Sequence, residues 1–183
     1  MVSAGEHPWV KGGLLFTRAA LAAVDEDARR AYARDEEACG YMRGPAGGPL
    51  LCDEAVALLN LANKLHQRDP ARYFRTGRAY FEFNTFKFEK AVNAALGEGR
   101  PVKVLYHSHV DAGAYFSPTD RAAMSMGTVP EVEGGPITMG PGPAYPLAFL
   151  VVSVSQGAVK ERGLFIWDED ARDFVPSSFT AID

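Results

Sequence analysis

The amino-acid sequence predicts an α/β fold, a single domain whose mixed, partly antiparallel and curved sheet is flanked by helices. Its 183 residues suit one domain around one hydrophobic core. Hydrophobic residues make up 47% of the chain and charged residues 23%, which is the composition of a soluble globular protein. Strand-like segments alternate with helical ones but also follow one another directly, as in hairpins, so the sheet is expected to contain antiparallel pairs.

The first third of the chain predicts a strand, a helix and a hairpin. Residues 13–16 are apolar enough for a short strand, and Thr17 can cap a helix whose charged end reaches Arg34. Residues 38–43 are strand-like. The apolar run 50–61 follows a turn rich in Gly and Pro, so the two runs are expected to pair as a hairpin.

The rest of the chain predicts a longer helix, further strands and a long loop. Residues 63–78 have no clear period and are expected to be an irregular excursion. Asn84 or Thr85 can cap a helix that ends in glycines. Residues 127–146 are dense in Gly and Pro, which predicts a loop or flap. The expected strands are apolar runs at 81–83, 102–106, 147–154 and 160–167.

Residues 13–175 are expected to form the domain, between a flexible polar leader at residues 1–12 and a tail at residues 176–183. No apolar run is long enough to span a bilayer, and the start of the chain lacks the basic and then apolar pattern of a signal peptide. The net charge of −4 argues against a nucleic-acid surface, because phosphate binding requires clustered Lys and Arg. We therefore expect neither a membrane nor a nucleic acid as a partner.

The two cysteines, Cys39 and Cys52, lie in strand-like segments, and no secretion signal accompanies them. Such cysteines are typically reduced and buried, which predicts a cytoplasmic protein without a disulfide. Neither has a Cys or His at ligand spacing, so both are poor candidates for metal binding.

Two of the four histidines, His107 and His109, stand one residue apart at the end of an expected strand. Residues i and i+2 of an extended chain point to the same face, so both imidazoles can reach one ion while Ser108 points away. An isolated His-x-His pair is more often an ordinary pair of surface or core histidines. The residues that follow change this interpretation.

Eight residues after His109 comes Ser117, and Asp120 follows three residues later at an expected helix start. A loop of this length can return a carboxylate over the end of the strand. Two imidazoles and one carboxylate leave a fourth tetrahedral position open, as a catalytic zinc site requires. The segment also has a purely structural explanation, because Ser117 can cap the helix, with Pro118 in its first turn.

The segment from His107 to Asp120 resembles the JAMM motif of MPN-domain metalloproteases, in which His-x-His is followed by seven residues, Ser, two residues and Asp. The family also has an upstream Glu, which Glu37 in Glu-Ala-Cys-Gly resembles. The resemblance covers roughly residues 14–165, most of one domain. It implies a single MPN domain with a cytidine-deaminase-like α/β fold.

The resemblance assigns a role to each motif residue. It implies that His107, His109 and Asp120 bind zinc, Zn2+, with one ion per chain. Glu37 would act as the base on the attacking water and pass the proton to the leaving amine. Ser117 would stabilise the oxyanion that develops on the scissile carbonyl.

The sequence departs from the family pattern in one place and is ambiguous in another. Glu36 precedes Glu37, and a slip of one residue would exchange them, although the spacing to Gly40 favours Glu37. Many relatives have Pro after the second His, where this chain has Val110 and Asp111, so the segment also resembles the start of the metallo-β-lactamase motif His-x-His-x-Asp-His. The final His of that motif is missing, and an amidohydrolase would need a barrel longer than this chain. Both alternatives are set aside.

The resemblance also implies a substrate and partners. Family members cut peptide or isopeptide bonds after the C-terminal tail of ubiquitin-like proteins, and several prokaryotic ones process small sulfur-carrier proteins of ubiquitin fold. The expected partners are therefore a ubiquitin-like or sulfur-carrier protein as substrate and, in addition, an E1-like adenylating enzyme. Two alternatives stay open, a non-catalytic MPN scaffold that binds such a partner without metal, and a zinc site that is only structural.

Other residues near the motif each have two interpretations. Asp111 is expected to be a loop residue or a hydrogen-bond acceptor for a ligand histidine. Tyr115 and Phe116 would pack beneath the loop or line the substrate groove. Asn60 and Asn63 would be solvated or receive the substrate backbone.

Overall fold

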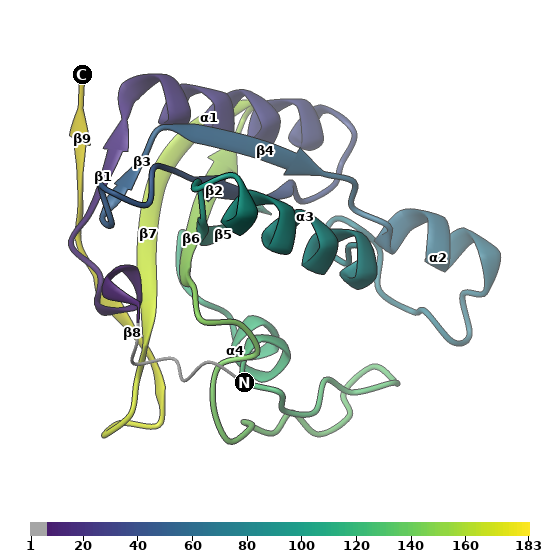
Figure 1. Ribbon diagram of the computed structural model, residues 1–183. Helices are drawn as coiled ribbons and strands as arrows, with labels where there is room; N and C mark the ends of the chain where they lie inside the picture. Colours follow the sequence, from purple (N-terminus) through teal and green to yellow (C-terminus); the bar gives the residue numbers. More distant parts are fainter. Residues whose placement is uncertain (1–6) are drawn as a thin grey trace.

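A computed structural model describes residues 7–183, which fold into layers of helices and strands (Figure 1). The architecture is the mixed α/β fold with a partly antiparallel sheet that the sequence predicts. In chain order the elements are the 3-10 helix η2 (Pro8–Lys11), β1 (Leu14–Thr17), α1 (Arg18–Ala33), β2 (Cys39–Arg43), β3 (Leu51–Cys52), β4 (Glu54–Leu58), α2 (Ala62–Arg68), α3 (Thr85–Gly97), β5 (Val102–Val110), α4 (Pro118–Met124), β6 (Ala148–Ser155), β7 (Ala158–Asp168), β8 (Asp173–Ser177) and β9 (Phe179–Ile182).

Six strands form the main sheet in the order β4-β2-β5-β6-β7-β8. Only β5 and β6 run parallel, and the other neighbours are antiparallel. The predicted hairpin is confirmed for β2 and β4. The apolar run 50–61 nevertheless splits, because β3 pairs with β1 in a second, parallel sheet of order β3-β1-β9.

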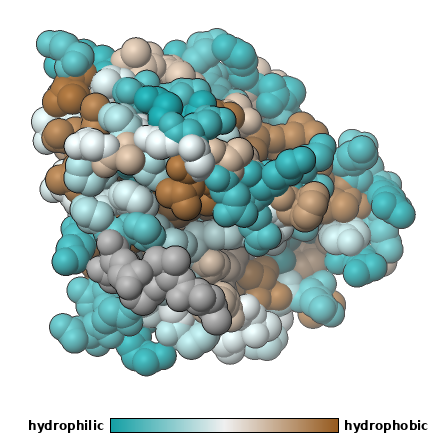
Figure 2. All heavy atoms as spheres, in the orientation of Figure 1, coloured by the Kyte–Doolittle hydropathy of each residue, from teal (hydrophilic) through white to brown (hydrophobic). Residues whose placement is uncertain are grey.

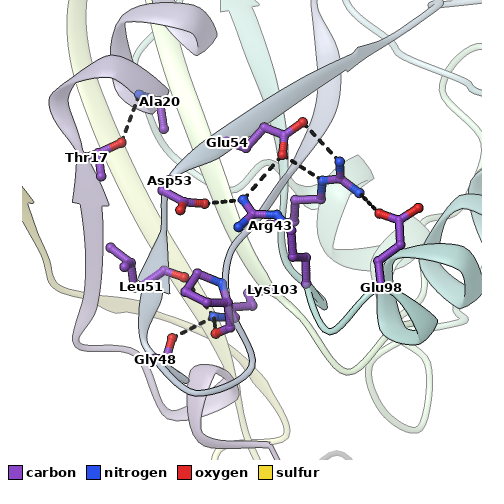
Figure 3. Close-up of polar contacts among 11 residues, drawn as sticks. Thr17, Ala20, Arg43, Gly48, Leu51, Asp53, Glu54, Glu98 and Lys103 are labelled. Carbon is purple, nitrogen blue, oxygen red and sulfur yellow. Dashed lines mark hydrogen bonds and ion pairs between the residues drawn. The ribbon is translucent and has the colours of Figure 1, made fainter.

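A buried lysine helps to explain this split (Figure 3). Lys103 on β5 is fully buried, and its Nζ donates hydrogen bonds to the carbonyls of Pro45, Gly48 and Leu51 at 3.0, 2.8 and 2.7 Å. A buried ammonium group is tolerated only when it is hydrogen-bonded. These three bonds hold residues 45–51 around the Lys103 ammonium group, and β3 is thereby placed beside β1.

Strand β5 is buried along its whole length and separates two hydrophobic cores. Val104 and Tyr106 pack with α1 on one face of the sheet, whereas Leu105 packs with α3 on the other. Because side chains alternate along a strand, His107 and His109 point to the same face as Leu105. The strand therefore presents both imidazoles from the rigid centre of the fold.

The helix caps agree with the sequence. The Thr17 side chain accepts a hydrogen bond from Ala20 N at 3.2 Å at the start of α1. The Asn84 side chain accepts one from Lys87 N at 2.9 Å, so Asn84 and not Thr85 caps α3.

Two expectations about the segment before α3 are wrong. Part of the expected irregular excursion forms the short helix α2, whose only buried side chain is Ala62, so it has no apolar period to detect. Residues 81–83 are not a strand. Asn60 Oδ1 accepts a hydrogen bond from Glu82 N at 3.1 Å, and Leu61 N donates to Glu82 O at 2.7 Å, so these backbone groups have partners outside a sheet.

Both ends of the described chain contact the region expected to form the domain. Residues 1–6 of the expected leader lie outside the described residues. Trp9 of η2 is buried, and its Nε1 donates to Pro146 O at 2.9 Å. Strand β9, within the expected tail, pairs with β1.

Cys39 and Cys52 are buried free thiols, as expected. Burial raises the pKa of each thiol to about 12, so both remain protonated at neutral pH. Within residues 7–183 no helix is long and apolar enough to cross a bilayer.

Candidate metal centre

Strand β5 and helix α4 bring together His107, His109 and Asp120, the three ligands predicted from the sequence. The two Nε2 atoms lie 3.2 Å apart. Asp120 Oδ2 lies 3.2 Å from His107 Nε2 and 3.4 Å from His109 Nε2. All three residues are buried, and their ligand atoms form a compact triangle that can hold a metal ion.

The triangle has the dimensions of one face of a metal tetrahedron. Ligand atoms about 2.0–2.1 Å from a zinc ion at tetrahedral angles lie roughly 3.3–3.4 Å from one another. His109 Nδ1 lies 2.7 Å from Gly113 O, and because a carbonyl only accepts, Nδ1 must carry the hydrogen. In the neutral ring the Nε2 lone pair then faces the Asp120 carboxylate, an arrangement that favours a cation between them.

A capping box holds the Asp120 carboxylate in place. Ser117 N donates to Asp120 Oδ2 at 2.8 Å, and Asp120 N donates to Ser117 Oγ at 3.1 Å. Burial raises the pKa of Asp120, but the contacts with His107 and His109 and the hydrogen bond from Ser117 outweigh burial, so its pKa lies well below the usual value. Asp120 can therefore take part in the helix cap and also serve as a metal ligand.

Phe116 and Arg121 fix the loop that returns Asp120 to β5. The sequence predicted that Phe116 would pack beneath this loop or line the substrate groove, but it predicted no role for Arg121. Arg121 Nε donates to Phe116 O at 3.1 Å, and its guanidinium also donates to Phe174 O on β8 at 2.9 Å. The only sequence signal is that both flank the Ser-Pro-x-Asp helix start. The Phe116 ring packs in the core against Phe149, Phe165 and Phe174.

Glu37 lies on the same face of the main sheet as His107 and His109. Cys39 is paired with His107 between β2 and β5, and residues two apart in an extended chain share a face. Two hydrogen bonds fix the Glu37 backbone, from Glu37 N to Gly77 O at 2.6 Å and from Asn60 Nδ2 to Glu37 O at 2.9 Å.

The Glu37 side chain is buried, and within residues 7–183 its carboxylate has no hydrogen-bond partner. Burial and then the negative charge of Asp120 raise its pKa well above the ordinary value, and a bound cation would oppose this shift. Glu36 differs, because its carboxylate accepts hydrogen bonds from Arg34 at 2.7 Å and Asn63 at 3.2 Å.

The family follows from comparison with known proteins. The family model described as prokaryotic homologues of the JAB domain matches residues 17–169. The chain belongs to this family. No curated protein is similar enough in sequence to count as a match.

Solved structures from Desulfitobacterium hafniense and Salinibacter ruber share the fold of this JAB domain. The solution structure of a protein from Desulfitobacterium hafniense is 17% identical, with a TM-score of 0.60 over 93% of both chains. A protein from Salinibacter ruber is 21% identical, with a TM-score of 0.51 over 93% of this chain and 92% of that one. A JAB1/MPN domain protein from Archaeoglobus fulgidus is 13% identical, with a TM-score of 0.45 over 91% and 98%.

Aromatic rings surround the candidate metal centre of the JAB domain. The Phe81 ring stacks on His107 with centroids 4.5 Å apart, and Tyr115 meets the edge of His109 at 5.0 Å. Phe116 is buried beneath the loop, whereas Tyr115 is 52% exposed beside the site. A cavity of about 220 Å³ opens next to Asp120, lined in part by Phe81, Phe83 and Tyr145.

The polar neighbours of the centre have structural roles. Asp111 is a loop residue with φ of 55°, and its carboxylate accepts hydrogen bonds from Tyr32, Arg78 and Ser155. It is not the acceptor for a ligand histidine, because Gly113 O takes that place for His109.

The two asparagines form hydrogen bonds with the surrounding loops. Asn60 is buried, and its amide joins Glu37 O, Tyr80 O and two backbone N–H groups. Asn63 binds Glu36 and Gly77 N. The expectation of a solvated side chain is wrong for Asn60, because the local loops need its amide to satisfy their own backbone groups.

The expected flap at residues 127–146 contains no helix or strand, only an isolated bridge between Thr128 and Thr138. Gly140 N donates to Ser125 Oγ at 2.8 Å, which ties the return of the flap to the end of α4. The guanidinium of Arg75, in the loop that follows α2, donates a hydrogen bond to Pro130 O at 2.9 Å.

Proposed function

We propose that this JAB-domain protein is a zinc-dependent peptidase that hydrolyses the peptide or isopeptide bond at the C-terminal tail of a ubiquitin-like protein. The JAB/MPN family includes metalloproteases. The observation that carries the proposal is the triangle of His107, His109 and Asp120 beside the unpartnered carboxylate of Glu37. Three protein ligands would hold zinc and leave one position for reactants.

The chemistry divides between the ion and the side chains. Bound zinc supplies a Lewis acid that polarises a carbonyl and acidifies water. Glu37 accepts a proton from the attacking water and delivers it to the leaving amine nitrogen, for which a buried carboxylate of raised pKa is suited. Ser117 Oγ accepts the capping bond and still has its hydroxyl hydrogen to offer to the oxyanion.

The cavity beside Asp120 supports a substrate with an extended tail. Rings of Phe81, Phe83 and Tyr145 line it and leave about 220 Å³, which suits a narrow tail of small residues. Such a tail would be held mainly through its backbone, as a strand is added beside a groove. A sulfur carrier or other ubiquitin-like protein has this kind of end, which supports the choice of substrate class.

Mass spectrometry of reaction products tests the proposal. Sulfur-carrier and ubiquitin-like proteins that carry an extra residue or a linked lysine after the tail would be incubated with zinc-loaded protein. We expect loss of the added group, no loss with Glu37→Gln, and reversible inhibition by a chelator. If a ubiquitin-like protein binds but no bond is cut by the zinc-loaded parent, the chain is a binding scaffold and the proposal fails.

A further inference from the structure

A hollow of about 430 Å³ lies between the end of β4, helix α2 and the start of α3. It is larger than the cavity of about 220 Å³ beside Asp120. In Figure 2, brown apolar atoms lie beside teal polar ones toward the α2 end of the molecule. Leu59, at the mouth of the hollow, is 70% exposed. The other apolar side chains that line it are half-buried: Leu58, Leu61, Leu65 and Phe83.

The polar lining of this hollow is cationic. Lys64, Arg68 and Lys87 line it together with Asn84, and none of the acidic residues in the described part of the chain does. None of the three cations takes part in an ion pair within residues 7–183, whereas Arg43 and Arg162 on other faces pair with carboxylates. In a chain of net charge −4, this local positive charge favours an acidic partner.

The hollow lies beside the cavity next to Asp120, on the other side of Phe83. Phe83 lines both the hollow and the cavity that contains Asp120. Leu65 also lines a further cavity, of about 160 Å³, that reaches Val129 and Pro130 in the flap. A protein whose tail entered the cavity beside Asp120 would therefore extend over the hollow.

We infer that the hollow docks an acidic segment with a bulky apolar side chain, carried by the same protein substrate whose tail reaches the metal triad. This inference rests on the proposed function for the identity of the partner. The apolar side chain would enter between the exposed Leu59 and the half-buried leucines, and carboxylates of the segment would meet the three cations around it. An apolar centre with a charged rim is the usual arrangement of a protein interface.

Binding of a defined peptide tests the hollow without any hydrolysis. The probe is fluorescein-labelled Gly-Glu-Asp-Leu-Phe-Asp-Glu-Gly, with a second peptide in which Gln and Asn replace the carboxylates. We expect the acidic peptide to bind the parent about tenfold tighter than its amide counterpart, because a few exposed charge pairs contribute that much together. Lys64→Glu combined with Arg68→Glu should abolish the difference, whereas the control Lys11→Glu with Lys160→Glu should retain it.

Amide shifts in nuclear magnetic resonance spectra locate the bound peptide. We expect the largest changes on α2 and at the start of α3. The docking site would be overturned if the parent bound neither peptide or bound both equally, or if the Lys64→Glu/Arg68→Glu variant still preferred the acidic peptide as the parent does. Shift changes confined to another face would overturn it as well.

Steady-state kinetics test whether the docked segment belongs to the substrate. For a ubiquitin-like protein that is cleaved, the Lys64→Glu/Arg68→Glu variant should have a higher KM than the parent and the same kcat. For a peptide that contains only the tail, the variant and the parent should have the same kinetic constants. An unchanged KM would overturn the link to the substrate. If the acidic peptide binds as expected but no ubiquitin-like protein is cut, the proposed hydrolysis fails and the docking surface stands.

Discussion

Glu36 and Glu37 are neighbours in the sequence, but their carboxylates have different surroundings. Glu36 binds Arg34 and Asn63, while Glu37 is buried beside Asp120 without a hydrogen-bond partner. The pair is therefore a matched test of the proposed base. We expect Glu37→Gln to keep its zinc and to lose about 10²-fold or more in kcat, the contribution of a general base. Glu36→Gln should stay within about twofold of the parent. Normal cleavage by Glu37→Gln would refute the assignment.

The raised pKa of Glu37 also predicts a pH dependence of stability in the metal-free protein. A folded-state pKa above the ordinary 4.5 means that the folded chain binds more protons than the unfolded one above pH 4.5. Ionisation of Glu37 therefore lowers the free energy of unfolding as pH rises. The stability gain of Glu37→Gln over the parent should grow with increasing pH above 4.5, as measured by denaturant unfolding in chelator. A gain that is constant or shrinks would show that Glu37 is not desolvated.

At the scale of elements, α1 and α4 begin with the same capping bond but have different neighbours. Thr17 accepts from Ala20 N, and Ser117 accepts from Asp120 N beside the metal ligands. Thr17→Ala and Ser117→Ala should each cost about 1 kcal/mol of unfolding free energy, the loss of one N-cap.

Only Ser117→Ala should also reduce kcat, by about 10²-fold, because an oxyanion donor is lost. Hydrolysis is measured with saturating zinc, so that the loss of the oxyanion donor is separated from the loss of stability. Equal activity of both variants would leave Ser117 with a capping role alone.

Lys103 gives an element-level test that is separate from catalysis. Lys103→Met removes three hydrogen bonds and leaves the carbonyls of Pro45, Gly48 and Leu51 without this donor. We expect a loss of about 3 kcal/mol in the free energy of unfolding, with unchanged metal content. A loss below about 1 kcal/mol would mean that the turn before β3 is held by other contacts.

The sequence was informative where a local pattern determines the structure. The alternation of β5 and the spacing from His109 to Asp120 predicted a cluster that the structure brings within 3.4 Å. Helix α2 could not be predicted, because it buries too little to leave an apolar period. The contact of Phe81 with His107 and that of Arg121 with β8 join residues far apart in the sequence, so no local pattern predicts these contacts.

At the scale of the whole molecule, two hydrophobic cores fix β5 from both faces. His107 and His109 come from this central strand, and Asp120 comes from α4. Contacts of Phe116 and Arg121 connect α4 to β8. The ligands are therefore held by the tertiary fold, and a bound ion should in turn stabilise it. We expect a chelator to lower Tm and zinc to restore it, as measured by circular dichroism. An unchanged Tm would indicate that the triangle binds no metal.

The metal content of the purified protein tests the central claim most directly. Inductively coupled plasma mass spectrometry would be applied to the parent and to Asp120→Ala, with Asp111→Ala as a control, because Asp111 is a nearby carboxylate that binds Tyr32 and Arg78 instead. We predict about one zinc ion per chain in the parent and in Asp111→Ala, and none in Asp120→Ala, since three ligands define a single site. A parent that binds no zinc, or a folded Asp120→Ala that keeps its full zinc content, would contradict this assignment.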